Sequence, residues 1–100
     1  MIKNFLSTND VEYRKCNISE LETIIVKSKY YLFFNSNNSE SIDILRHIRN
    51  GIAHGRTKLK KEKGTICIYI LDFNKEKKMS AQIHIPLNYI EKFRKLYKKI

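Results

Sequence analysis

The residues best suited to chemistry lie in one short stretch, residues 49–54, with the sequence RNGIAH. Arg49 can hold two phosphate oxygens with its planar guanidinium group, and His54 can move a proton near neutral pH. Asn50, one helical turn before His54, could orient the imidazole or bond a phosphate. Together these groups suit phosphodiester cleavage. The simpler interpretation is a surface arginine and a histidine that ends a helix, where the helix dipole favours it.

A helix must position these residues, and residues 40–54 have the required period. The side expected to face the core carries Ile44, Leu45, Ile48 and Ile52. The other side carries Asp43, His47, Asn50 and His54. On a straight helix Arg49 points roughly 140° away from His54. The two can meet on one ligand only if the helix loosens after Gly51 or if a second chain supplies one of them. Gly55 fits a C-terminal cap.

The string formed by residues 49–55 resembles the signature of the HEPN family, in which an arginine, a polar residue, spacers and a histidine end a helix. The resemblance implies a metal-independent endoribonuclease of toxin–antitoxin or anti-phage defence systems, working as a homodimer with both motifs facing one cleft. It assigns Arg49 and His54 to the catalytic pair and Asn50 to the polar position. Members silenced by a nucleotidyltransferase antitoxin carry a tyrosine two residues after the histidine. This chain has Arg56 there, which gives no support to control by tyrosine modification.

The remaining elements predict one domain over residues 1–100. Ser19 and Glu22 have the spacing of a capping box, which predicts a helix over residues 19–34. Its aromatic residues 30–34 are expected in the core or a dimer interface rather than in a base-stacking surface. Residues 65–73 and 79–85 predict a β-hairpin, residues 57–64 a basic connection, and residues 87–99 a basic amphipathic helix. A short helix is expected around residues 10–15. The expected class is mainly α: a HEPN-like helical bundle with a β-hairpin inserted before the C-terminal helix.

The charge is concentrated after the motif. The chain carries a formal charge of +10, and residues 51–100 hold 13 basic and 4 acidic side chains, against 7 and 6 in residues 1–50. This asymmetry favours a polyanion such as RNA as partner, although an AT-rich genome also enriches lysine. The residues expected to bind RNA are Arg46, His47, Arg56, Lys58, Lys60, Lys61 and Lys63.

Other site types have little support in the sequence. His47 and His54 could share a metal, but Asp43 is the only carboxylate on their face, so neither a metal site nor a cofactor is expected. His84 alternates to the solvent side of the hairpin and is expected to be exposed. Cys16 and Cys67 form no disulfide framework, which favours a reducing cytoplasm. No apolar run approaches the ~20 residues of a membrane span, and no membrane association is expected.

The sequence therefore predicts an endoribonuclease, with an antitoxin or another defence-system component as a further partner. The alternative is a non-catalytic RNA- or protein-binding HEPN module, and a toxin-neutralising or scaffolding subunit is a second rival. An enzyme needs Arg49 and His54 together, whereas a binding module depends on its summed lysines and should tolerate His54→Ala. A scaffold would lose its function with the dimer interface instead.

Overall fold

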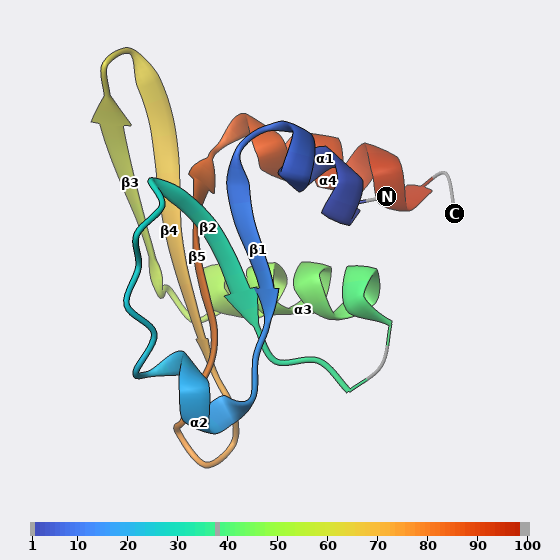
Figure 1. Cartoon of the computed structure of the whole chain (residues 1–100), viewed down its shortest axis with the longest axis vertical. Coiled ribbons are helices and arrows are strands. Elements are labelled where there is room, and N and C mark those ends of the chain that lie inside the picture. Colours follow the sequence, from blue (N-terminus) through green and yellow to red (C-terminus); the bar gives the residue numbers. More distant parts are fainter. Residues whose placement is uncertain (1, 38, 99–100) are drawn as a thin grey trace.

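A five-stranded mixed sheet forms the centre of the computed structural model, which describes residues 2–37 and 39–98 (Figure 1). The elements in chain order are α1 (Ile2–Thr8), β1 (Val11–Lys15), α2 (Ile18–Leu21), β2 (Tyr30–Phe34), α3 (Glu40–Ala53), β3 (Thr57–Glu62), β4 (Thr65–Phe73), β5 (Met79–Pro86) and α4 (Asn88–Lys98). The strand order is β1-β2-β5-β4-β3, with only β1 and β2 parallel. The fold is α+β, and the prediction of a mainly α, HEPN-like helical bundle is wrong.

The two faces of the sheet are covered unequally. Figure 1 shows α1, α3 and α4 on one side, and the main core joins apolar residues of these helices to that side, among them Leu6, Ile44, Ile48 and Phe93. A smaller core on the other side contains Cys16, Leu21, Tyr31 and Phe33, around the short α2. Among the residues that the structure describes, no helix covers the rest of this second side, toward β3.

Strand β2 replaces most of the helix predicted over residues 19–34. Helix α2 has four residues, and its start is fixed by the Glu20 carboxylate, which accepts a hydrogen bond from the Asn17 N–H at 3.0 Å. β2 lies between β1 and β5 and sends alternate side chains into the two cores, Leu32 to one and Phe33 to the other. A strand that is buried on both faces lacks the alternation of polar and apolar residues that identifies a half-buried strand. For this reason the apolar run of β2 was interpreted as the apolar side of a helix. The predicted burial of Tyr31, Phe33 and Phe34 is confirmed.

Two further segments predicted otherwise are strands. Residues 11–15 form β1 rather than a helix, and residues 57–62 form the edge strand β3 rather than a connection. Lys63 and Gly64, both with positive φ (48° and 83°), make the two-residue turn into β4, as hairpin turns of the primed types require. The lysines of β3 suit an exposed edge, since charged side chains discourage pairing with another chain.

The predicted hairpin and the helices predicted over residues 40–54 and 87–99 are confirmed as β4–β5, α3 and α4, while Lys99 lies outside the described residues. His84, expected to be exposed, is only 4% exposed. Its Nδ1 donates a hydrogen bond to the Lys29 carbonyl oxygen at 2.7 Å, and its ring stacks on Tyr69 with centroids 3.9 Å apart. The imidazole is therefore enclosed by the segment before β2, which contains Lys29, and by the neighbouring strand β4, which contains Tyr69.

Candidate functional site at the end of helix α3

Helix α3 ends at the motif histidine. His54 is the C-terminal cap, with φ −91° and ψ 7°, and Gly55 follows with φ +67°. The Gly55 N–H donates to the Ile52 carbonyl oxygen at 3.1 Å, and the Arg56 N–H donates to that of Gly51 at 2.9 Å. These are the two hydrogen bonds of a Schellman motif, and they confirm Gly55 as part of the cap. The turn exposes both His54 and Arg56 and leads directly into β3.

The buried stripe of α3 lies one residue earlier than the sequence predicted. Its members are Asp43, Ile44, His47, Ile48 and Gly51. Ile44 and Ile48 are confirmed as core, but Ile52 is 50% exposed. Gly51 explains the shift, because a Cβ there would lie 2.4 Å from Ile70 Cγ2 and 2.9 Å from the Leu71 carbonyl oxygen. The missing side chain lets α3 approach β4 closely, so Gly51 is a contact point within an unbroken helix rather than a hinge.

A buried polar network accompanies this contact. His47, 2% exposed, faces the Asp72 carboxylate through Nδ1 at 2.8 Å, and through Nε2 it donates to the Asn35 carbonyl oxygen at 2.7 Å. Both partners are acceptors, so a proton is held between the Nδ1 and the carboxylate oxygen. Nearby, the Ser36 hydroxyl donates to Asp43 at 2.7 Å. Because its ring is enclosed and both nitrogens are engaged, His47 is not placed to contact RNA or to share a metal with His54.

His54 opens onto a pocket of about 660 Å³ between the end of α3 and the β4–β5 turn. Among the residues that line it are Arg46 and Asn50 of α3, the cap residue His54, and Arg56, which follows the cap. The turn adds Asn74 and Lys75, which the sequence did not single out, since a turn residue has no signal that links it to a distant helix. His47 and Asp72 also border this pocket, while the Arg46 guanidinium lies 3.3 Å from Asp43. The pocket thus joins the exposed imidazole of His54, the Asn50 amide and three cationic side chains, those of Arg46, Arg56 and Lys75.

Arg49 lies elsewhere. It lines a groove between α3 and α4, together with Ile42, Leu45, Ile52, Ile90 and Arg94. Ile42 and Ile52 are each about half exposed, at 51% and 50%. Arg46 borders both the groove and the His54 pocket, but Arg49 borders only the groove. Within one chain, therefore, Asn50 and His54 are brought together and Arg49 is separated from them, as the helical wheel predicted.

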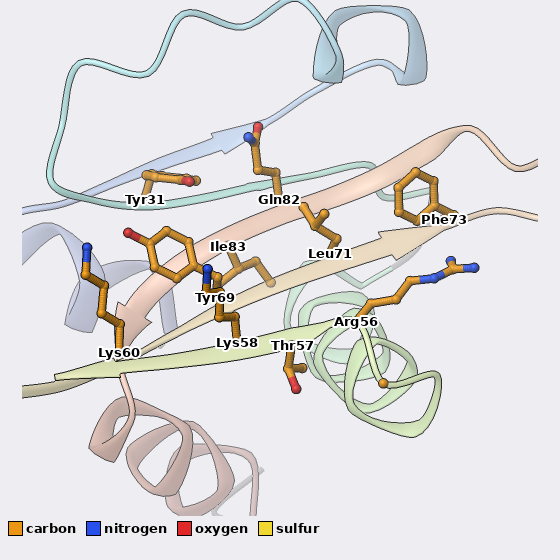
Figure 2. Close-up of a pocket in the computed structure, with 11 residues that line it drawn as sticks. Tyr31, Arg56, Thr57, Lys58, Lys60, Tyr69, Leu71, Phe73, Gln82 and Ile83 are labelled. Carbon is orange, nitrogen blue, oxygen red and sulfur yellow. The ribbon is translucent and has the colours of Figure 1, made fainter.

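The basic residues after the motif lie on both faces of the sheet, along its edge strand β3. Arg56 places its guanidinium over the Phe73 ring, 4.6 Å from the centroid. Figure 2 shows Arg56, Lys58 and Lys60 on one side of the sheet, where they line a second cavity with Phe73. Lys61 alternates with Lys60 along β3 and belongs to the opposite side. The predicted RNA-binding lysines therefore do not form one surface.

Over the described ranges, 2–37 and 39–98, no three His, Cys, Asp or Glu side chains are grouped closely enough to hold a metal ion. Among the same residues, no helix has the length and apolar character needed to cross a membrane.

The model of the family HEPN pEK499 p136 matches residues 1–100. No curated protein and no solved structure matches the chain.

Proposed function

This chain belongs to the HEPN pEK499 p136 family, and on that premise we propose that it is a HEPN-type endoribonuclease that cleaves RNA without a metal ion. The observation that carries the proposal is the pocket at the end of α3. An exposed histidine lies there beside an amide and the cationic side chains of Arg46 and Arg56. A proton-transfer group beside phosphate-binding groups is the minimum that phosphodiester cleavage requires.

The proposed reaction uses the RNA's own 2′-hydroxyl as nucleophile. Its oxygen attacks the adjacent phosphorus and its proton passes to a base, while the bond from phosphorus to the 5′-oxygen breaks and that oxygen gains a proton. His54 transfers a proton at one of these two oxygens. Asn50 orients the imidazole or bonds the phosphate, and an arginine stabilises the charge that builds on the phosphate oxygens. The products are a 2′,3′-cyclic phosphate and a 5′-hydroxyl.

Arg49 enters this site from a second copy of the chain. The groove that contains Arg49 has two half-exposed isoleucines, Ile42 and Ile52, and a two-fold contact along α3 would cover them. Such a contact would place the arginine of each chain near the histidine of the other. We therefore propose a homodimer, acting in the cytoplasm in toxin–antitoxin or anti-phage defence with an antitoxin or defence component as partner.

The alternative is a non-catalytic RNA- or protein-binding HEPN module. One observation favours it: Arg49 and His54 border different cavities in the single chain. If the protein stays monomeric at micromolar concentration, this alternative is the better interpretation.

The primary test is the chemistry of the products. Purified protein incubated with total RNA in EDTA should yield 2′,3′-cyclic phosphate and 5′-hydroxyl ends. DNA and 2′-O-methyl RNA of the same sequence should stay intact, because both lack the nucleophile. Cleavage only after metal addition, or cleavage of the 2′-O-methyl control, would refute the mechanism.

A mixing experiment tests the shared site. Arg49→Ala and His54→Ala proteins should each be inactive as homodimers. When the two are unfolded together and refolded, the heterodimers contain one intact site, so roughly a quarter of the native activity should return. If no activity returns although heterodimers form, the two residues do not act across the interface.

A further inference from the structure

The side of the sheet opposite α3 and α4 contains a second cavity, of about 670 Å³, here called the open-face pocket. Its wall is formed by Tyr31 of β2, Gln82 of β5 and three residues of β4, Tyr69, Leu71 and Phe73. Its rim carries Arg56, Lys58 and Lys60. These residues belong to the neighbouring strands β2, β5, β4 and β3, apart from Arg56, which directly precedes β3. Figure 2 shows their side chains on the same side of the sheet. The pocket is thus apolar and aromatic inside and cationic along one edge.

The strand register aligns these residues in two rows. In the first row, Tyr31 pairs with His84, His84 with Tyr69, and Tyr69 with Lys58. In the second row, Gln82 pairs with Leu71. Burial raises the pKa of the Tyr31 hydroxyl, and the neighbouring Tyr69 adds to this effect, so the phenol stays protonated and can donate a hydrogen bond.

Two buried acceptors near this pocket have no hydrogen-bond partner among the described residues. One is the Gln82 Oε1, whose residue lines the cavity. The other is the Nε2 of His84. It is an acceptor because the Nδ1 of the same ring carries the hydrogen that is donated to the Lys29 carbonyl oxygen. A buried polar atom without a partner is destabilising in the free protein, and a ligand that brings N–H donors would satisfy it.

We propose that the open-face pocket binds single-stranded RNA, with nucleobases against the aromatic wall and phosphates along Lys58 and Lys60. Aromatic walls accept every base through its flat face, and lysines on one edge of the pocket match a backbone that runs beside the bases. The Gln82 Oε1 would accept a hydrogen bond from a base amino group, which cytosine has and uracil lacks. The cationic rim favours a polyanion over an apolar protein segment.

The open-face pocket is continuous with the candidate catalytic site. Arg56 and Phe73, in contact with each other, border both cavities. A strand held on the open face would pass over this pair and reach His54. The inference therefore rests on the proposed function and extends it, by adding a binding surface for RNA beyond the cleaved bond.

The first test uses a matched pair of double variants in β3 and the turn that follows it. Lys58→Gln with Lys60→Gln changes the open-face rim, whereas Lys61→Gln with Lys63→Gln removes the same charge away from it. The probe is a fluorescent 2′-O-methyl oligocytidine of about ten nucleotides, titrated by anisotropy. The rim pair should weaken binding about tenfold and lower the salt slope by about 1.4, while the control pair changes binding less than twofold. Equal effects of the two pairs would overturn the proposal.

The second test addresses the bases. Tyr69→Leu should weaken binding about tenfold, whereas Tyr69→Phe, which keeps the ring, should bind within twofold of the native protein. The native protein should prefer oligocytidine over oligouridine at least about fivefold, and Gln82→Leu should remove this preference. Thermal unfolding of each variant, followed by circular dichroism, separates lost binding from lost folding. Unchanged affinity in a folded Tyr69→Leu protein contradicts base binding at this pocket.

Cleavage assays on the same variants separate the two proposals. If native protein cleaves RNA and the rim and Tyr69 variants bind and cleave as the native protein does, the open-face proposal fails and the nuclease proposal stands. If the native protein does not cleave but shows the predicted binding pattern, the nuclease proposal fails and the open-face proposal stands. If it binds no single-stranded RNA at all, the pocket has another occupant, and the inference is wrong.

Discussion

The middle and the C-terminal end of helix α3 carry histidines on the same helix face, seven residues apart, yet their surroundings differ completely. His47, in the middle, is buried with both ring nitrogens engaged. His54, at the end, is exposed and borders a pocket lined by cationic side chains. The difference comes from the neighbouring elements. β4 supplies Asp72 opposite the middle of the helix, whereas the chain turns away at Gly55 and leaves the His54 side chain uncovered. The helix face on which a histidine lies therefore does not decide whether it is buried or exposed.

The largest expected effect is on the exposed end. His54→Ala should reduce RNA cleavage by about 10²–10⁴-fold or more, because proton transfer by a positioned side chain contributes that much. Its melting temperature should stay close to the native value, since the ring is exposed. Cleavage rates from gel assays and melting curves measure the two quantities. A His54→Ala protein that cuts RNA at the native rate would show that the exposed histidine has no role in cleavage.

The middle of the helix should respond in the opposite manner. His47→Ala leaves the Asp72 carboxylate buried without its ring partner, and we expect a loss of about 3–5 kcal/mol in the free energy of unfolding. Asp72→Ala should lose a similar amount. In a double-mutant cycle the two losses should be far from additive, because each removes the same interaction. Urea unfolding measures all four proteins, and additive losses would show that the contact contributes little.

The fold was predictable where one face of an element is polar. The β4–β5 hairpin, α3 and α4 have clear polar and apolar sides, and their sequence periods identified them. β2 is covered on both faces and β3 is an exposed lysine-rich edge, so neither has the alternation of a half-buried strand. Their identity depends on the strands beside them, which a local pattern does not contain.

The placement of the motif residues on α3 was predictable from the sequence, but their surroundings were not. The spacing of Arg49 and His54 correctly placed them on different sides of α3. The same wheel assigned Asp43 and His47 to the solvent side, since polar side chains are usually exposed. They are buried because Ser36, Asn35 and Asp72, from other elements, satisfy them. Such pairings between distant segments become visible only in the folded chain.

A smaller effect is expected at Gly51, which belongs to the buried middle. Its alanine variant would place a methyl group 2.4 Å from Ile70 Cγ2 and 2.9 Å from a backbone oxygen of Leu71. The backbone oxygen cannot rotate away, so α3 must shift from β4, and overpacking of this kind destabilises by about 1–3 kcal/mol. The gain in helix propensity, about 1 kcal/mol, offsets part of this loss. A Gly51→Ala protein more stable than the native one in urea would show that the helix does not need this close approach.

The smallest effect is expected at Gly55, which belongs to the exposed end. No atom lies within 4 Å of a Cβ built there, but φ is +67°. The loss in Gly55→Ala should therefore be conformational, about 1–2 kcal/mol. Gly55→Asn is the matched control, because asparagine tolerates the left-handed region better than alanine does, and it should lose clearly less in the same urea titration. If both variants lost equally, the penalty would come from contacts absent in the single chain. Because Gly55 adjoins His54, contact with a second chain at the C-terminal end of α3 would be the physical explanation for that result.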